Sequence, residues 1–371
     1  MECSEKQIWN SCTRETLENL VVDAPDEEIR QKVLRNWDNV AKPIDGMGSF
    51  ETLTAQIGAI QGTESVDISK KAVLIMCADN GIVEEGISQS GQEVTTAVAK
   101  NMAKKKSSVG KMAEAIGADT IPIDIGINQT EKIPGVVDKK IRLGTRNFRK
   151  ESAMTEEEAV SAIQTGIEMV WECKKAGYRI IATGEMGIGN TTTSSAIAAS
   201  LLDCEVKEVT GRGAGLREEK LIHKQKIIAE AIEKYQLRKA DAIRILTVVG
   251  GLDIAGLTGI CIGGALFHIP IVLDGVISMV AALLAERIVP GTKAYLLPSH
   301  KGKEPAMEKL AKELGLEPVI DAKLALGEGT GAVMMLSLLE TALCVYRDRT
   351  TFSDIQIEQY ERLNGKTGIQ S

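Results

Sequence analysis

The fold of this chain is decided by Tyr178-Arg179-Ile180-Ile181-Ala182 and the segment that follows it, Gly184-Glu185-Met186-Gly187-Ile188-Gly189-Asn190-Thr191-Thr192-Thr193. An apolar run turns at glycines and continues into Ser194-Ser195-Ala196-Ile197-Ala198-Ala199, a good helix former. The order strand, glycine-rich turn and helix exposes backbone N–H groups at the positive end of a helix, which is a geometry that binds phosphate. The threonines could add hydroxyl donors to such a site or simply cap the helix with a polar first turn.

A second glycine-flanked acid lies far along the chain, in Leu326-Gly327-Glu328-Gly329-Thr330-Gly331-Ala332. Glu328 stands just ahead of an apolar helical run, where it could accept a proton or only cap the helix dipole. Glu185 has the same two interpretations, and a carboxylate beside a phosphate turn could also bind ribose hydroxyls or a base nitrogen. Two such acids in one chain predict an enzyme that acts on a phosphorylated small molecule.

The pattern of apolar strand, polar or glycine turn and helix recurs along the chain. Further strands are expected at residues 72–77, 120–125, 242–249, 271–273 and 294–297. This alternation predicts an α/β fold, a doubly wound, mostly parallel Rossmann-like sheet with a smaller helical domain formed by the chain ends. Ligands of such sheets bind at the carboxyl ends of the strands. The residues expected at that rim are Asp79, Glu185, Asp253, Asp274 and His300.

Helix signals mark the rest of the chain. Thr155 and Glu158 have the spacing of a capping box, and Gly177 is expected to end the helix that follows. Apolar residues from 29 to 40 fall at helical spacing before Pro43. We expect residues 1–66 to be the N-terminal helical part of the small domain and 67–332 the Rossmann-like catalytic domain. Residues 333–371 should be a C-terminal helical part that packs with the N-terminal region.

Composition excludes several functions. The 371 residues carry a formal net charge of −7, and aromatic residues are only 3%, so neither a basic patch nor stacking platforms for nucleic acid are evident. The seven cysteines and three histidines are dispersed without metal-site spacing, so we expect no metal and no cofactor. An odd, scattered cysteine count fits a reducing cytoplasm, and no signal peptide is apparent at Met1.

One uncharged stretch, residues 254–273, has the length of a membrane span. It contains four glycines, His268 and Pro270, and it is bounded by Asp253 and Asp274. The break at Pro270 predicts a buried helix followed by a short parallel strand instead. We therefore expect no membrane insertion.

Several familiar signatures are absent. No G-x-x-x-x-G-K-[ST] occurs, which argues against a P-loop nucleotidase. The glycines after Ala182 do not form G-x-G-x-x-G, and the acid expected about 20 residues later is missing, which weakens a dinucleotide-dependent dehydrogenase. No G-x-S-x-G nucleophile elbow is present.

With these motifs the chain resembles the nicotinate-nucleotide–dimethylbenzimidazole phosphoribosyltransferase family of cobalamin biosynthesis. The resemblance runs from Lys42-Pro43 to about Leu343, and its most specific parts are the two glycine-flanked acids. Further matches are Gly211-Arg212-Gly213-x-Gly215-Leu216, Gly250-Gly251, Pro270-x-Val272-x-Asp274-Gly275, Glu85-Gly86-Ile87-Ser88 and Gln92-Glu93-Val94-Thr95.

The resemblance implies transfer of ribose phosphate from nicotinate mononucleotide to a nitrogen of an aromatic base, with release of nicotinate. The leaving group is already a cationic pyridinium, so the reaction needs no general acid and no metal, and one carboxylate suffices as base. By resemblance Glu328 is that base, Glu185 is a second acid in the pocket, and the protein is a homodimer without cofactor. The other residues implied in substrate binding are Gly187, Gly189, Asn190, Thr191, Lys224, Ser90, Gln92, Asp253, Gly327 and Gly329.

The chain also departs from the family pattern. Asn80 stands where the family usually has histidine, Gly302 replaces a serine, and Ala325 replaces an arginine often found three residues before the base. Because both acids are retained, an active transferase is the leading hypothesis, with benzimidazoles first among acceptors and purines or phenols also possible. The departures leave open an alternative: a non-catalytic or partner-dependent subunit of a paired assembly with an altered acceptor.

Overall fold

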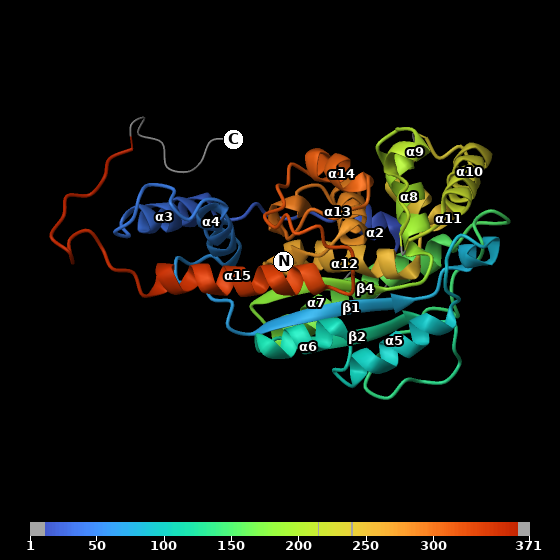
Figure 1. Cartoon of the computed structure of the whole chain (residues 1–371), viewed down its shortest axis with the longest axis horizontal. Helices are drawn as coiled ribbons and strands as arrows, with labels where there is room; N and C mark the ends of the chain where they lie inside the picture. The colour runs from blue at the N-terminus through green and yellow to red at the C-terminus, as the bar shows by residue number, and fades with distance from the viewer. Residues whose placement is uncertain (1–11, 214, 239, 363–371) are drawn as a thin grey trace.

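A parallel sheet of six strands is the centre of the structure, a computed structural model that describes residues 12–213, 215–238 and 240–362. The strands lie in the order β3-β2-β1-β4-β5-β6, and the labelled part of the sheet is visible in Figure 1. Every pairing is parallel. The bounds are β1 Lys71–Ala78, β2 Asp119–Gly126, β3 Val137–Asp138, β4 Ile180–Met186, β5 Ile271–Leu273 and β6 Leu296–Pro298.

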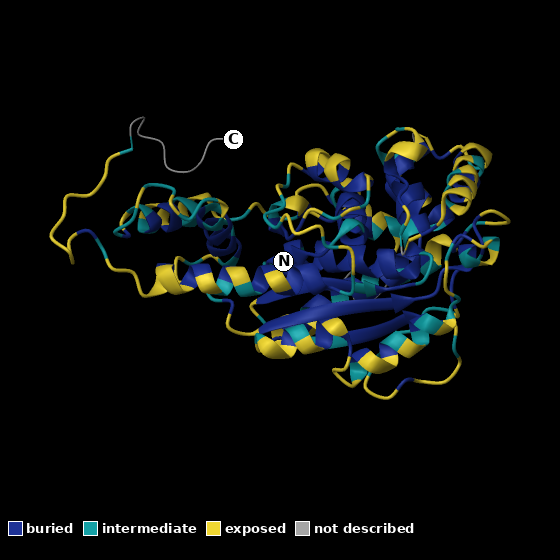
Figure 2. Cartoon of the chain, viewed as in Figure 1, coloured by how far each residue is buried: buried dark blue, intermediate teal, exposed yellow. Residues whose placement is uncertain are grey.

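Helices cover both faces of this sheet, which confirms the predicted α/β fold. Successive side chains of a strand point to opposite faces, so β1 divides its apolar residues between two cores. Ala72, Leu74 and Met76 join the core with α7 (Glu156–Lys175), α8 (Asn190–Leu201), α12 (Leu252–Phe267) and α13 (Val276–Ile288). The core on the other face contains Val73, Ile75 and Cys77 with α5 (Glu93–Ala103), α6 (Ser108–Ala115) and α15 (Thr330–Arg347). Figure 2 shows the buried strands between helices whose outer sides are exposed.

The strand order places a topological switch point between β1 and β4. From β1 the chain builds outward to β2 and β3, then returns to add β4, β5 and β6 on the other side. In open parallel sheets ligands bind in the crevice at this point, outside the carboxyl ends of the strands. Asp79 follows β1 and Glu185 lies at the end of β4, so these two of the predicted rim residues lie at the switch point.

The uncharged stretch 254–273 forms a buried helix and a short strand, as expected. Helix α12 packs so closely on α7 that side chains would not fit at the crossing. A Cβ on Gly166 would lie 2.0 Å from the Gly256 carbonyl oxygen, and one on Gly259 would lie 1.9 Å from the Ile163 carbonyl oxygen. These glycines therefore serve helix contact inside the protein.

Local helix signals were largely correct. Helix α7 begins with the predicted capping box between Thr155 and Glu158, and Gly177 follows its end with φ 84°. Asp26 caps α3 (Glu27–Asp38), the expected N-terminal helix. The other helices are α2 Arg14–Glu18, α4 Ser49–Gln61, α9 Val206–Val209, α10 Glu218–Lys234, α14 Ala306–Leu314, and the 3₁₀ turns Gly81–Glu85 and Thr292–Tyr295.

One strand prediction was wrong, and another was correct except for its bounds. Residues 242–249 form helix α11 (Ala242–Val249), capped by the Asp241 carboxylate, which accepts a hydrogen bond from Arg244 N at 2.9 Å. Asp241, Arg244 and Thr247 recur every three residues and are the ones not buried, a helical period within a β-branched run. The strand expected at 294–297 is β6, which starts at Leu296 after a 3₁₀ turn.

Helix α3 and the loop after it pack against the described C-terminal region. The rings of Trp37 in α3 and Tyr346 in α15 lie 5.2 Å apart, and the Arg362 guanidinium bonds the carboxylates of Asp38 and Asp45. Figure 1 shows α3 and α4 beside the far end of α15, away from the sheet. Helix α15 is continuous across the expected boundary after residue 332, and the division into domains stays a prediction.

Among the described helices, α15 alone has the length and apolar composition that a membrane span requires. Within its most apolar window 56% of the residues are buried in the fold. Core helices of globular proteins show the same combination, so this composition is weak evidence for a membrane segment.

Candidate active site

The glycine-rich turn lies where the sequence predicted it, although the strand before it is longer. Gly184 and Glu185 belong to β4, which ends at Met186. Gly187, Ile188 and Gly189 form the turn, and α8 begins at Asn190. Gly189 caps the helix with φ 95°, a conformation that favours glycine, and it offers no side chain to satisfy the first N–H groups. Asn190 N donates to the Gly187 carbonyl oxygen at 3.0 Å and Thr192 N to the Gly189 carbonyl oxygen at 2.9 Å, so the turn itself satisfies these groups. The positive end of the helix dipole still favours an anion here.

The second glycine-flanked acid folds directly against the first. A Cβ on Gly327 would lie 2.7 Å from Glu185 Oε1, and one on Gly184 would lie 2.6 Å from the Glu328 carbonyl oxygen. The two loops can approach this closely only because glycines stand at the contact. Residues 143 positions apart in sequence, Glu185 and Glu328, therefore belong to one site.

Both acids line one open cavity at the carboxyl ends of the strands. The cavity encloses about 1290 Å³, including space open to solvent. Its wall also contains the three positions Gly302, Ala325 and Ser90. The remaining lining residues are Val94, Val98, Met186, Gly187, Ile188, Asn190, Thr191, Gly213, Asp274, Gly275, Val276, Ile277, Ser278, His300, Lys303, Glu304, Leu324, Leu326 and Gly327. Apolar and polar groups are mixed on this wall, as is usual for sites that bind an aromatic ring and a phosphate.

An amide links two acids at the floor of the cavity. Asn190 Nδ2 donates to Asp253 Oδ2 at 3.0 Å and also bonds the Glu185 carboxylate. Burial raises the pKa of Glu185 to about 8, the neighbouring Asp253 charge adds to this rise, and the Asn190 hydrogen bond opposes it. Burial also raises the pKa of Asp253 to about 6. The unliganded site therefore favours a protonated Glu185 near neutral pH.

We expect Glu185→Gln to change the pH dependence of stability. The pKa of Glu185 is about 8 in the folded protein, against an ordinary value of 4.5. Its protonated form therefore contributes its full stabilisation below about pH 4.5. This contribution is lost as the pH rises through 8. Glutamine stays neutral at every pH. The melting temperature of the variant, minus that of the wild type, should therefore increase from pH 5 to pH 9. Thermal unfolding at several pH values tests this, with exposed Glu233→Gln as the control; parallel curves for variant and wild type would contradict it.

Asp253 reaches the site differently from the prediction. It follows no strand but stands in the first turn of α12, fully buried, and it does not line the cavity. The Oδ1 atoms of Asp253 and of buried Asn80 have no hydrogen-bond partner among the described residues. Both atoms lie close to Gly251, since a Cβ on that glycine would be 2.4 Å from each of them. Asp253 thus holds Asn190 from below, and Asn80 occupies the space beside it.

Gln92 also lies behind the wall. Its Nε2 donates to the Asn80 carbonyl oxygen at 3.2 Å, and its Oε1 accepts from Asn128 Nδ2 at 2.9 Å. Gln92 therefore supports the loop after β1, while the exposed Ser90 two residues earlier lines the cavity. Of the two residues predicted for the acceptor pocket, the structure brings Ser90 to the cavity wall.

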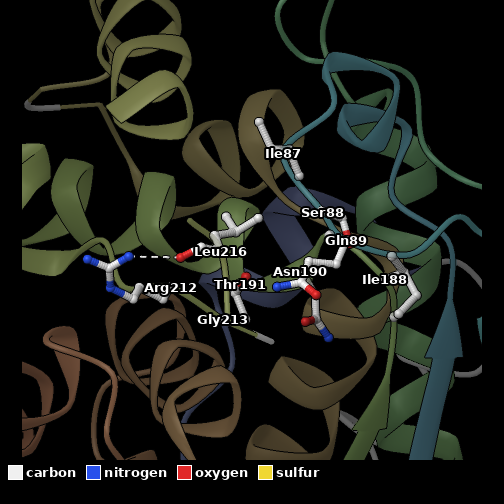
Figure 3. A pocket seen from close by; sticks show the side chains of 11 residues that line it. Ile87, Ser88, Gln89, Ile188, Asn190, Thr191, Arg212, Gly213 and Leu216 are labelled. Atoms are coloured by element: carbon white, nitrogen blue, oxygen red, sulfur yellow. Dashed lines mark hydrogen bonds between the residues drawn. The ribbon is translucent and has the colours of Figure 1, made fainter. Parts of the chain in front are cut away.

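A smaller hollow of about 430 Å³ adjoins the glycine turn. Figure 3 shows Thr191 and Asn190 between Arg212, Gly213 and Leu216 on one side and Ile87, Ser88 and Gln89 on the other. Arg212, Gly213 and Leu216, which belong to the family motif that begins at Gly211, thus form one wall of this hollow, and Arg212 Nη1 donates to the Leu216 carbonyl oxygen at 2.8 Å.

Lys224 lies beneath Thr191 and is fully buried. Its Nζ donates to Thr191 Oγ1 at 3.0 Å and to the Gly211 carbonyl oxygen at 3.3 Å. No carboxylate of the described residues forms an ion pair with it, and burial lowers its pKa to about 8. Buried charges are normally paired, so a cation in this position calls for an anion at the adjacent turn.

Glu328 is half-buried, and its Oε2 has no hydrogen-bond partner among the described residues. Burial raises the pKa of its carboxyl, the backbone N–H of Val109 lowers it, and the charge of Asp274 raises it further. Glu328 lines the cavity, and a carboxylate with a buried, unpartnered oxygen and a raised proton affinity is suited to accept a proton. Gly329 lies behind it, packed against Val73 and Gly184.

The sequence predicts Asp274 at the rim but indicates no role for it. Its signals there are the Asp-Gly pair after a strand and the family motif Pro270-x-Val272-x-Asp274-Gly275. In the structure Asp274 is 2% exposed, and its carboxylate accepts hydrogen bonds from three backbone N–H groups of the Glu328 loop.

Comparison with known proteins agrees with this geometry. A family model described as phosphoribosyltransferase matches residues 22–357. The nicotinate-nucleotide–dimethylbenzimidazole phosphoribosyltransferase of Clostridium acetobutylicum is 43% identical over 349 residues, 94% of this chain and 99% of that protein. The protein of the same name from Acetivibrio thermocellus is 42% identical, over 90% and 95% of the two chains.

Solved structures give the same result. The crystal structure of CobT from Thermus thermophilus superposes with a TM-score of 0.85 at 33% identity, covering 90% of this chain and 100% of that one. The match therefore extends over most of the fold. This chain belongs to the phosphoribosyltransferase family whose members include the nicotinate-nucleotide–dimethylbenzimidazole phosphoribosyltransferases.

Proposed function

We propose that this protein transfers the ribose 5-phosphate of nicotinate mononucleotide to a nitrogen of 5,6-dimethylbenzimidazole or a related aromatic base. The products are nicotinate and α-ribazole phosphate, for cobalamin or cobamide biosynthesis. The observation that carries the proposal is the shared cavity, which is lined both by Glu328, a carboxylate with an unpartnered oxygen among the described residues, and by the glycine turn before α8. Two relatives that carry the name of this enzyme match this chain over 99% and 95% of their own length.

The chain's own groups can supply each part of the reaction. The positive end of the α8 dipole and the Lys224 cation beneath Thr191 would hold the phosphate. The bond between C1′ of the ribose and the pyridinium nitrogen breaks, and nicotinate leaves with the electron pair as a neutral pyridine. A lone pair of the acceptor nitrogen forms the new bond to C1′. The N–H proton of the acceptor ring moves to the Glu328 carboxylate, so charge and atoms balance.

Glu185 has a different role in this proposal. With its pKa raised to about 8, its carboxyl is protonated near neutral pH and can donate a hydrogen bond to the ribose or the leaving base. Asn190 and Asp253 hold it in place from below. The two acids thus divide the work, one as hydrogen-bond donor and one as proton acceptor, because their surroundings differ.

We further propose that the protein is cytoplasmic and forms a homodimer. The scattered cysteines support the first point and the resemblance to the family supports the second. The alternative of a non-catalytic subunit has no support among the described residues, since both glycine-flanked acids meet at the cavity. Asn80 is buried behind the wall, whereas Gly302 and Ala325 line it and can alter the choice of acceptor.

A direct assay tests the proposal. Purified protein is incubated with nicotinate mononucleotide and a panel of benzimidazoles, purines and phenols, and products are separated by chromatography and identified by mass. We expect nicotinate and one dominant ribotide in equal amounts. Binding of nicotinate mononucleotide without release of nicotinate, with every base in the panel, would overturn the proposal.

A further inference from the structure

The loop that carries Glu328 has an unusual backbone. Three consecutive residues have positive φ angles: Gly327 at 84°, Glu328 at 62° and Gly329 at 96°. Glycine adopts such angles freely, but glutamate does so at a cost, and a costly conformation persists only where its surroundings hold it. The direction of the Glu328 side chain therefore depends on what fixes this loop.

Asp274 contributes three hydrogen bonds to that fixation, and Thr330 adds two to the Gly327 carbonyl oxygen, from its N–H at 3.0 Å and its Oγ1 at 2.8 Å. Its Oδ2 accepts from Gly329 N at 3.2 Å, and its Oδ1 accepts from Gly331 N at 2.8 Å and Ala332 N at 3.2 Å. Gly329 is the N-cap of α15 and has no side chain that could make these bonds. Asp274 thus caps α15 from another element, the end of β5, and ties both the loop and the helix start to the sheet.

Asp274 is itself held from three directions. Its N–H donates to Thr183 Oγ1 at 3.1 Å, and its carbonyl oxygen accepts from Ser299 Oγ at 3.0 Å. His300 lies so close that a Cβ on Gly331 would be 2.0 Å from its Nδ1 and 3.0 Å from Asp274 Oδ1. Burial raises the pKa of Asp274, while the His300 charge and the three backbone donors lower it. Both carboxylate oxygens accept hydrogen bonds, as an ionised group does.

We propose that Asp274 is the positioning residue for Glu328: it holds the left-handed loop 327–329 and so aims the proton-accepting carboxylate into the cavity. The proposal rests on the role of Glu328 as base in the proposed function. Asp274 acts through backbone N–H groups and through its charge.

The charge has a predictable effect. The titratable or charged groups around Glu328 are Asp274 after β5, Glu185 on β4, and His300, Lys303 and Glu304 after β6. The Asp274 charge raises the pKa of Glu328, so Asp274→Asn should lower that pKa. A base works only when ionised, so the acidic limb of the pH profile for kcat should move to lower pH in the variant.

The test compares Asp274→Asn, Glu328→Gln and the double variant with Asp26→Asn, which changes an aspartate cap on α3 far from the cavity. We expect Asp274→Asn to lower kcat about 10²-fold, since misplacement of a catalytic group by about 1 Å can cost that much. KM for nicotinate mononucleotide should change less than about threefold, because the phosphate turn is not altered. The double variant should be no slower than Glu328→Gln alone, because Asp274 acts through Glu328.

A purely structural role gives other results. A wild-type kcat with an unmoved acidic limb in Asp274→Asn, or an additional loss in the double variant, would overturn the proposal. Should Asp274→Asn not fold, Ser299→Ala removes one support of Asp274, and we expect a smaller loss of kcat at constant KM that disappears in the Glu328→Gln background. Unchanged kcat in Ser299→Ala would then count against the proposal.

Hydrogen exchange separates this inference from the proposed function. Amides of Gly329, Gly331 and Ala332 should exchange faster in Asp274→Asn than in wild type or Asp26→Asn, whether or not the wild type turns over. If the wild type forms no ribotide with any base, the proposed function fails, and exchange still decides whether Asp274 holds the loop. Unchanged exchange at these amides would overturn the positioning role.

Discussion

Glu328→Gln should lower kcat about 10²- to 10⁴-fold, the range that general base catalysis contributes. Glutamine has the size of glutamate and can keep the loop conformation, but it cannot accept the proton of the acceptor ring. Binding of nicotinate mononucleotide should be retained, because the substitution alters neither the glycine turn nor Lys224 beneath Thr191. Steady-state kinetics and calorimetric titration with nicotinate mononucleotide measure the two effects separately.

The matched control is Glu317→Gln, an exposed glutamate eleven positions earlier, which should keep wild-type kinetics. The pH profile adds a second criterion, since the wild-type acidic limb reflects a carboxyl whose pKa burial raises, and this limb should be absent from the residual activity of Glu328→Gln. A variant with more than about a tenth of wild-type kcat would show that the proton leaves by another route.

The second large effect is expected for Lys224→Met. This variant should bind nicotinate mononucleotide more weakly without an equal loss of folding stability. A hydrogen bond to a charged group contributes about 1.5–3 kcal/mol, so KM for nicotinate mononucleotide should rise roughly 10- to 100-fold. Stability should not fall in parallel, because Lys224 is a buried cation without a carboxylate partner among the described residues. Methionine fills the same space without the cost of burying charge.

The pH dependence of this variant has a defined sign. Burial lowers the pKa of Lys224 from 10.5 to about 8, so the unfolded chain binds more protons than the folded one between these values. Wild-type stability should therefore rise from pH 8 toward 10.5 on account of Lys224, and the advantage of Lys224→Met should shrink over the same range. Lys220→Met, an exposed position on the same helix, is the control. Unchanged KM in Lys224→Met would contradict the phosphate role.

Much of the fold was predictable because its signals are local. The capping box of α7 joins residues three positions apart, and the glycine turn after β4 depends on the φ angle of Gly189. Helix α11 was missed because a β-branched run was interpreted as a strand, although polar residues at every third position indicated a helix. There a helix cap and one-sided burial outweighed β propensity.

The sequence predicted individual residues of the candidate site but not the tertiary contacts that join them. Glu185, Asn190 and Thr191 were recognisable from the turn that contains them. That Gln92 and Asp253 support the site from behind its wall follows only from tertiary contacts. Asp274 had no signal for a role, because an Asp-Gly pair after a strand is common in any α/β protein.

The sequence by itself determined most of the strands and helices, the glycine turn after β4 and the family, since these depend on residues that are neighbours along the chain. The tertiary structure decided what each acid can do. Asn190 forms a hydrogen bond with Asp253, 63 positions away in sequence, and Asp274 forms one with Gly329, 55 positions away. Burial and these distant hydrogen bonds set the proton affinity and direction of a carboxylate, and neither exists until the sheet brings the loops together.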